Sequence, residues 1–512
     1  MRGVAYKKPS PTVRAESFRI GFWTVLGGTI AAGIGRVVWW LVRQWPVWLV
    51  VGLGYAAWRV HARFDTHGLS LAALALVTVL VAWRVLHARS FKLVVSWPLR
   101  SWWRRVARYG RGWDELVAVT GLVKPFRGRE LAPVLGRCRS TDTVDRLRVR
   151  TLRGQVLADY AGNAERFAAS NGAIDCRVRS VRTPVIRFRG KTLVRSRVVP
   201  RLLELWFLVT DPLRDPVALF PIPDKPNLHR LRVAHREDGL PWHLRLRGTH
   251  VLVAGRTGAG KGSVLWSIVR ALASAVRDRW VELWVVDPKG GMELAAGQGL
   301  FARYCYGDNN TDDEGRKRAY QLDFAEFLET LVDRMQERQR DLRGVSRTHK
   351  PRPGDPHIVV LIDELACLTA YVTDREAKKR IEAALGLLLS QGRAVGITVV
   401  AALQDARKEV LPDRGLFPTR IGLAVNEPEE TDLVLGSTAR KNGARCDEIS
   451  EDTPGVAFVA VETEKEPVRV RFGYVDDEEI TRLAVTYPPG AAPVDPYPSD
   501  PTHTETRQED QS

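Results

Sequence analysis

The chain has 512 residues, enough for two or three domains that each bury a core. Its formal net charge of +18 and isoelectric point near 9.9 favour nucleic acid or an anionic membrane surface as a partner. The five cysteines are scattered and show neither Cys-x-x-Cys nor Cys/His spacing, which excludes a disulfide framework and a zinc site. We therefore expect reduced thiols in a cytosolic setting.

Residues 1–87 are predicted to form a membrane segment. Apolar stretches lie at 18–35, 45–58 and 69–82, and flanking residues extend the last two towards the roughly 20 residues that a spanning helix needs. Eleven of the sixteen tryptophans fall within the first 113 residues, several at the ends of these stretches, as in an interfacial belt. The alternative is a set of buried helices in a soluble domain.

The charge pattern predicts the orientation of this segment. Residues 84–111 contain eight Lys or Arg and no Asp or Glu, so the positive-inside rule places them in the cytoplasm. Because the N-terminus is also basic, we prefer a hairpin of helices at 41–60 and 68–86, with the loop at 61–68 outside. The stretch at 18–35 would lie at the interface or, alternatively, make a third crossing. We expect a multi-pass protein of the cytoplasmic membrane, with the rest of the chain in the cytoplasm.

Residues 88–225 are predicted to be a basic juxtamembrane linker followed by a small α/β domain. The linker interleaves Arg with Trp, which suits an anionic lipid surface. Nucleic acid would fit the same composition. The alternating residues 176–181 and 185–189 are typical of strands. The arginines of this domain either guide a polyanion or are solvated on exposed strand faces.

Residues 226–475 are predicted to form a P-loop domain, and a phosphate-binding motif lies near its start. Residues 251–263, VLVAGRTGAGKGS, combine a buried strand with a Gly-rich turn, and helical spacing follows. Backbone N–H groups of such a turn converge on phosphate oxygens, and the helix N-terminus adds partial positive charge. The alternative is a Gly-rich turn that only connects a strand to a helix. Lys261 would reach the β- and γ-phosphates. The predicted nucleotide-binding residues are Gly255, Arg256, Thr257, Gly258, Ala259, Gly260, Lys261, Gly262 and Ser263.

The motif departs from its usual pattern at one position. A Ser or Thr that ligates Mg²⁺ normally follows the lysine. Here Gly262 holds that place and Ser263 comes one residue later. Either Ser263 ligates the metal from a shifted position, or fewer protein groups hold it.

Two further strands are predicted to deliver polar groups to the same site. Residues 358–364 end in Asp363 and Glu364, at the strand end where ligands of parallel α/β sheets bind. We predict that Asp363 holds Mg²⁺ or its water and that Glu364 orients the water that attacks the γ-phosphate. An acid-rich helix start is the alternative. The strand at 395–404 ends in Gln404, a candidate sensor of the γ-phosphate. The alternation of strands and helices predicts an α/β fold: a mostly parallel sheet with helices on both faces.

These motifs resemble a known family. GRTGAGKGS, VVDPK, IVVLIDELACL, QGRAVGITVVAALQ and FPTRIGLAV occur in the order and spacing of the FtsK/SpoIIIE motors, over about 230–460. The resemblance implies a RecA-like P-loop ATPase that uses ATP and Mg²⁺, assembles as a homo-hexameric ring and pumps double-stranded DNA. It assigns Lys261 to phosphate binding, Asp363 to metal, Glu364 to water activation and Gln404 to sensing. The KGS ending, the membrane segment and the single motor domain resemble actinomycete transfer proteins of conjugative plasmids and integrative elements.

The family also uses an arginine finger, which a neighbouring subunit inserts to stabilise transition-state charge. Arg393 and Arg420 are the candidates here, with Arg420 preferred, and either could instead form a structural ion pair.

The predicted function is a membrane-anchored, ATP-driven double-stranded DNA translocase for conjugative transfer, working with accessory proteins of a mobile element. Residues 476–512 are acidic and then Pro-rich, and we predict a disordered tail without a folded module that reads DNA sequence. A protein-export motor, a chromosome-segregation DNA pump and an ATP-binding scaffold without turnover are the alternatives. The Asp363–Glu364 pair argues against the scaffold.

Overall fold

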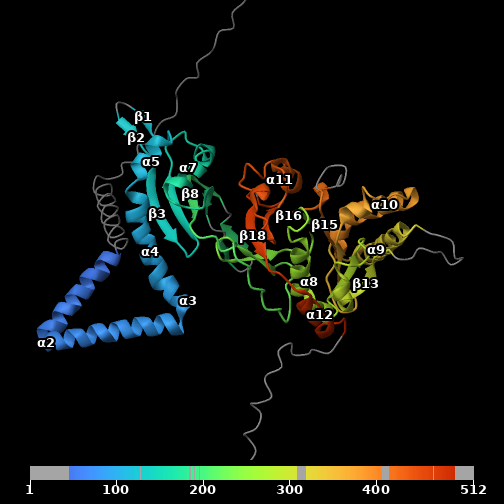
Figure 1. Cartoon of the computed structure of the whole chain (residues 1–512), viewed down its shortest axis with the longest axis horizontal. Helices are drawn as coiled ribbons and strands as arrows, with labels where there is room; N and C mark the ends of the chain where they lie inside the picture. The colour runs from blue at the N-terminus through green and yellow to red at the C-terminus, as the bar shows by residue number, and fades with distance from the viewer. Residues whose placement is uncertain are drawn as a thin grey trace, which may run out of the picture. The chain divides into compact units, whose positions relative to one another are not determined.

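The structure is a computed structural model, and its elements are shown in Figure 1. The described residues are 45–126, 129–183, 186–188, 191–194, 197–307, 319–405, 414–464 and 466–490. The predicted segment at 18–35, residues 41–44 of the first predicted crossing, and the Pro-rich end from 491 lie outside them. The chain divides into two compact units, one of residues 1–112 with 138–140 and one of residues 113–137 with 141–512.

The described part of the first unit up to Gly110 is mainly helical. Helix α2 (Trp45–Leu86) continues through residues 61–68, so the predicted loop there is wrong. The segment HARFDTHG contains no proline and only one glycine, and nothing in it stops a helix. The elements that follow are α3 (Ala88–Phe91), the π-helix η1 (Lys92–Ser96), α4 (Trp97–Trp103) and the π-helix η2 (Arg104–Gly110).

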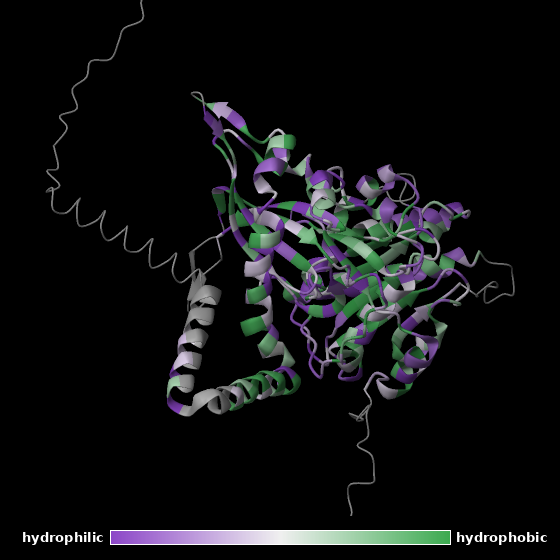
Figure 2. Ribbon diagram, turned by 60° about the vertical axis from the view of Figure 1, so that its left-hand side comes forward, coloured by the Kyte–Doolittle hydropathy of each residue, from purple (hydrophilic) through white to green (hydrophobic). Residues whose placement is uncertain are grey.

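The C-terminal half of α2 exposes apolar side chains. Leu71, Leu74, Val81 and Val85 are each more than half exposed, and Figure 2 shows hydrophobic residues along this part of the helix. Among the residues that the structure describes, no helix is long and apolar enough to cross a membrane. The predicted crossings at 41–60 and 68–86 are therefore not confirmed.

The second unit begins with a small domain that has its own core. Its four-stranded sheet has the order β3-β4-β8-β5, and β8 pairs antiparallel with both β4 and β5. Leu147, Leu205 and Phe207 are fully buried, as are Tyr160 and Phe167 of the helices that pack on β5. The bounds are α5 (Trp113–Val119), β1 (Lys124–Phe126), β2 (Arg129–Leu131), β3 (Val134–Ser140), β4 (Val144–Arg150), α6 (Leu157–Ala161), α7 (Ala164–Ser170), β5 (Asp175–Arg182), β6 (Ile186–Phe188), β7 (Lys191–Val194) and β8 (Val198–Leu208).

A ten-stranded mixed sheet forms the larger domain. The strand order is β10-β9-β18-β17-β16-β11-β15-β14-β12-β13. The strands are β9 (Leu231–Arg236), β10 (Pro241–Leu244), β11 (Val251–Ala254), β12 (Val281–Val286), β13 (Phe301–Cys305), β14 (His357–Ile362), β15 (Ile397–Leu403), β16 (Thr419–Gly422), β17 (Val456–Val461) and β18 (Val468–Phe472). The pairings from β16 to β13 are parallel, and those from β10 to β16 are antiparallel. The prediction of a mostly parallel sheet therefore holds for one half only, because two hairpins, β9–β10 and β17–β18, extend it.

Helices cover both faces of the parallel half. The connection β11–α8–β12 runs towards the β13 edge, whereas β13–α9–β14 and β14–α10–β15 run back. Because such crossovers are right-handed, α8 lies on one face and α9 and α10 lie on the other. The helices are α8 (Lys261–Arg277), α9 (Gln321–Leu342), α10 (Arg375–Gln391), α11 (Pro428–Leu435) and α12 (Asp477–Thr486). The buried strands β11, β14 and β15 form the centre of the core.

The prediction of a disordered tail from residue 476 is wrong for its first part. Asp476 caps α12 by accepting a hydrogen bond from the Glu479 N–H group. Acidic residues in the first turn stabilise the positive helix N-terminus. Ile480 and Leu483, one helical turn apart, are buried in the core. The acidic composition thus marks a helix start and not a disordered segment.

Candidate active site

The Gly-rich turn between β11 and α8 has a shape that requires glycine. Gly260 has a φ of +96° and directly precedes Lys261, the first residue of α8. A Cβ at Gly260 would lie 2.4 Å from the Gly455 nitrogen, and the Gly455 N–H group donates to the Ala259 carbonyl at 2.9 Å. The turn therefore packs directly on the residues that precede β17, and only a glycine fits at 260.

The opposite side of the turn is open. Added Cβ atoms at Gly258 and Gly262 would meet nothing within 4 Å. Lys261 is buried, and its Nζ donates to the carbonyls of Gly255 at 2.9 Å and Arg256 at 3.1 Å. Burial lowers the pKa of Lys261, and the charge of Glu364 partly offsets this effect. An open, glycine-lined surface at a helix N-terminus, with a lysine folded onto it, fits a phosphate group.

Asp363 and Glu364 lie directly after β14, at the same edge of the sheet. Both residues are 4% exposed. The Oδ2 atom of Asp363 forms an ion pair with the Lys289 Nζ at 2.8 Å. Glu364 accepts a hydrogen bond from the Gln404 N–H group through Oε1 at 3.2 Å, whereas its Oε2 has no hydrogen-bond partner among the described residues. Burial raises the pKa of Glu364, and that backbone hydrogen bond opposes the rise.

Gln404 connects the phosphate-binding turn with Glu364. It follows β15, and its Oε1 accepts a hydrogen bond from the Thr257 hydroxyl at 3.2 Å. Its backbone contacts Glu364 in the same place. The structure thus brings Lys261, Asp363, Glu364 and Gln404 together, because β11, β14 and β15 are parallel neighbours that end at one edge.

Two residues of this edge have no role in the sequence prediction. Asp287, directly after β12, is fully buried and accepts hydrogen bonds from the N–H groups of Glu293 at 3.1 Å and Leu294 at 2.9 Å. Burial raises the pKa of Asp287. Lys289, two residues later, is the ion-pair partner of Asp363. The rule that locates Asp363, a polar residue directly after a buried parallel strand, applies equally to Asp287 and would have found it.

Within this chain, neither candidate arginine finger lies at the edge of the sheet that carries Lys261 and Glu364. Arg420 lies on β16, where its Nε donates to the Phe417 carbonyl at 3.0 Å and burial lowers its pKa. Arg393 lies before β15, at the opposite edge of the sheet, and is exposed. It lines a cleft of about 880 Å³ together with Arg245, Arg343 and Arg347, and no carboxylate is among the lining residues.

The two predicted metal ligands come from different elements, Ser263 from α8 and Asp363 from the end of β14. Ser263 lies next to Gly455, with 3.8 Å between the Ser263 Cβ and an added Cβ on the glycine. Because consecutive helical residues point about 100° apart, Ser263 points in a different direction from a hydroxyl at position 262. Among the described residues, no group of three or more His, Cys, Asp or Glu side chains could hold a metal ion. The assignment of Asp363 and Ser263 as metal ligands stays a prediction.

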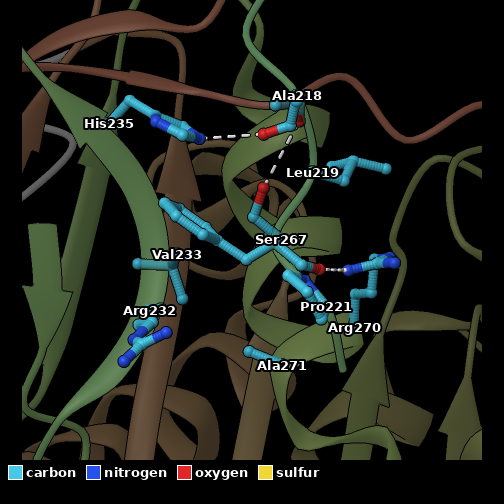
Figure 3. Close-up of a pocket in the computed structure, with 11 residues that line it drawn as sticks. Ala218, Leu219, Pro221, Arg232, Val233, His235, Ser267, Arg270 and Ala271 are labelled. Carbon is cyan, nitrogen blue, oxygen red and sulfur yellow. Dashed lines mark hydrogen bonds between the residues drawn. The ribbon is translucent and has the colours of Figure 1, made fainter. Parts of the chain in front are cut away.

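The side of α8 away from the phosphate-binding turn packs against the segment that precedes β9. A small cavity of about 20 Å³ lies between this helix, β9 and residues 218–221, and Figure 3 shows residues that line it. Arg270 of α8 donates to the Phe220 carbonyl, and the Phe220 ring stacks on His235 with centroids 4.2 Å apart. Room for about one water molecule does not make a ligand site, so these contacts serve to fasten the segment before β9 to the helix.

Arginines of the small domain are engaged in contacts with the larger domain. Arg146 pairs with Asp238 at 3.2 Å, and Arg177 pairs with Glu237 at 2.7 Å. The Arg146 guanidinium also lies 3.9 Å from the centroid of the Trp206 ring. Arg146 and Arg177 therefore contact the larger domain, whereas polyanion guidance and solvation both stay predictions for the exposed arginines, among them Arg150 and Arg182.

Comparison with known proteins finds a family match for the part of the chain that contains the phosphate-binding turn. The model of the FtsK/SpoIIIE family matches residues 215–349. DNA translocase FtsK of Oceanobacillus iheyensis is 28% identical over 246 residues, which are 46% of this chain and 29% of the relative. Transfer protein TraSA of Streptomyces ambofaciens is 28% identical over 349 residues, which are 65% of this chain and 76% of TraSA. The matched region is thus less than a third of the FtsK relative.

Two solved structures are similar to parts of this chain. The conjugation coupling protein TcpA of pCW3, in a monomer form with ATPγS, is 18% identical with a TM-score of 0.44, and the match covers 74% of this chain and 98% of TcpA. The cytoplasmic domain of the type VII secretion ATPase EccC of Thermomonospora curvata is 25% identical with a TM-score of 0.42, over 55% of this chain and 33% of EccC.

Proposed function

Since the chain belongs to the FtsK/SpoIIIE family of P-loop ATPases, we propose that it is an ATP-driven pump for double-stranded DNA that acts in conjugative transfer of a plasmid or mobile element. One observation carries the enzymatic part. Lys261 and Gln404 meet Glu364 at one edge of the sheet, and one carboxylate oxygen of Glu364 has no protein partner among the described residues. The named relatives, a DNA translocase and a transfer protein, support DNA as the cargo.

The chain's own groups account for the steps of hydrolysis. The open turn and Lys261 would hold the phosphates of ATP, and Thr257 and Gln404, which are hydrogen-bonded to each other, would lie beside the terminal phosphate. Glu364 accepts a proton from a water molecule whose oxygen attacks the γ-phosphorus, while the bond from that phosphorus to ADP breaks. The raised pKa of Glu364 makes it a better proton acceptor than an ordinary carboxylate. Mg²⁺, held by Asp363 and by no hydroxyl at Gly262, would neutralise charge on the phosphates.

A neighbouring subunit supplies the remaining charge, and the structure favours Arg393 over Arg420 for this role. Arg420 is engaged by the Phe417 carbonyl, whereas Arg393 is exposed in a cleft of arginines without carboxylates. Arg393 and the P-loop lie at opposite edges of the sheet. In a head-to-tail ring, opposite faces of consecutive subunits meet. The arrangement therefore suits a homo-hexamer in which Arg393 approaches the nucleotide of the next subunit.

Attachment to the cytoplasmic membrane is part of the proposal. Exposed Leu71, Leu74 and Val85 on α2 form an apolar surface that needs lipid or protein to cover it, and the basic, Trp-rich residues 88–111 suit an anionic lipid surface. Recovery of the full-length protein in the soluble fraction of lysed cells without detergent would contradict this part.

The test of the proposed activity is the ATPase rate of the full-length protein with duplex DNA, single-stranded DNA or no nucleic acid. Stimulation by duplex that is lost in Lys261→Ala and Glu364→Gln is expected. Turnover that ignores DNA would favour a protein-export motor. ATP binding without turnover under any condition would favour a scaffold.

A further inference from the structure

A lysine forms an ion pair with Asp363, the carboxylate that the proposed function assigns to the metal. Lys289 Nζ lies 2.8 Å from Asp363 Oδ2, and the two side chains are 30% and 6% exposed. Lys261, the lysine of the P-loop, does not take this position, because its Nζ is held by two carbonyls of its own turn. Asp363 therefore has one cationic partner in the described site, and that partner is Lys289.

The loop that carries Lys289 is built to hold it there. The fully buried Asp287 carboxylate accepts hydrogen bonds from the N–H groups of Glu293 and Leu294, which close the loop behind Lys289. Gly290 and Gly291 follow with φ of +73° and +79°. These angles reverse the chain at a place where other residues would be strained. The lysine is thus positioned by its backbone and does not reach Asp363 by chance.

The charges at this edge explain why a cation is needed. Asp287, Asp363 and Glu364 follow the ends of the neighbouring strands β12 and β14, and removing a carboxylate from water without a partner is strongly unfavourable. The Lys289 ammonium, whose Nζ lies 2.8 Å from Asp363 Oδ2, supplies that cation.

We propose that Lys289 is a resident counter-ion that competes with the divalent metal for Asp363, so that metal binding requires the lysine to leave. This inference rests on the proposed nucleotide site. It also makes sense of Gly262: with no hydroxyl beside the lysine of the P-loop, the metal depends more heavily on Asp363, and a competitor at that carboxylate controls its entry. Lys289 acts through Asp363 and is a positioning residue.

The test compares the full-length wild-type protein with Lys289→Met. Mn²⁺ replaces Mg²⁺ as a probe, and its binding in the presence of ADP is measured by electron paramagnetic resonance. We expect Lys289→Met to bind Mn²⁺ roughly fivefold more tightly, the effect of removing a partly exposed ion pair. Without metal or nucleotide, its Tm should fall by about 2–4 °C because Asp363 is left unpaired.

Two controls keep the result specific. Lys289→Arg should retain the wild-type Mn²⁺ affinity and Tm. Adding Asp363→Asn to Lys289→Met should restore the Tm of the metal-free protein, which a general packing defect would not allow. Unchanged or weaker Mn²⁺ binding in Lys289→Met overturns the inference, as does wild-type protein that binds ADP but no Mn²⁺. Failure to bind ADP at all would instead refute the proposed function, and the inference with it.

Discussion

Two glycines of the phosphate-binding turn, two residues apart, should respond in opposite ways to the same substitution. At Gly260 the φ of +96° is strained for alanine by about 1–2 kcal/mol. The new Cβ would also lie 2.4 Å from the Gly455 nitrogen, and moving that residue away breaks its hydrogen bond to Ala259, worth about 1 kcal/mol. Gly260→Ala should therefore cost about 2–3 kcal/mol. At Gly262, where a Cβ meets nothing within 4 Å, alanine should instead gain up to about 1 kcal/mol of helix propensity.

Thermal unfolding of the full-length protein, followed by tryptophan fluorescence, measures this difference. We expect Gly260→Ala to lower the Tm by roughly 5–10 °C and Gly262→Ala to leave it unchanged or slightly raised. Equal losses at the two positions would refute the assignment of a packed side and an open side to the turn.

The same open position allows a functional variant. Gly262→Ser places a hydroxyl where P-loops usually carry the metal ligand, and the structure offers it room. Tighter Mn²⁺ binding in the presence of ADP is expected. Binding that stays at the wild-type level would show that the hydroxyl does not reach the metal.

Three further predictions concern catalysis and stability. Glu364→Gln should lower ATP turnover by about 100- to 10,000-fold while fluorescent ATP analogues still bind, since it removes the proton acceptor; full turnover would exclude Glu364 as the base. Arg393→Ala should lower turnover by about 1,000-fold or more, and Arg420→Ala should change it little; the reverse result would restore Arg420 as the finger. Burial lowers the pKa of His250 to about 4 and that of His357 to about 3, so the unfolded state binds protons that the folded state does not. The contribution of these two histidines to stability is fully present above the pKa of histidine in the unfolded chain, near 6.5. Below that pH the free energy of unfolding should fall by up to about 2.7 kcal/mol per pH unit. Urea unfolding at pH 7.5 and pH 5.5 checks the sign, and equal stability at the two would contradict it.

The sequence locates the site well where a local rule suffices. Buried strands that end in polar residues identify Asp363, Glu364 and Gln404, because parallel neighbouring strands end at one edge. Lys289 does not follow from such a rule. Its position depends on a loop that the buried Asp287 closes, and neither the burial nor the hydrogen bonds of that loop are visible in composition or spacing.

Other features needed the strand order or the tertiary contacts. The choice between Arg393 and Arg420 depends on which edge of the sheet each one occupies, and the sequence does not give strand order. The antiparallel half of the sheet consists of two short hairpins, β9–β10 and β17–β18. They are joined by the pairing of β9 with β18, two strands that lie far apart in the chain. Helix α12 was missed because its acidic first turn dominates the composition, although Ile480 and Leu483 already have the spacing of a buried helical face.

The central claim is that ATP hydrolysis at Glu364 moves duplex DNA. The most direct measurement is displacement of a third strand from a DNA triplex by the full-length protein, followed with a labelled oligonucleotide. The account predicts displacement that requires ATP and disappears in Glu364→Gln and with a non-hydrolysable ATP analogue. Wild-type protein that hydrolyses ATP in the presence of the duplex and leaves the triplex intact would contradict it.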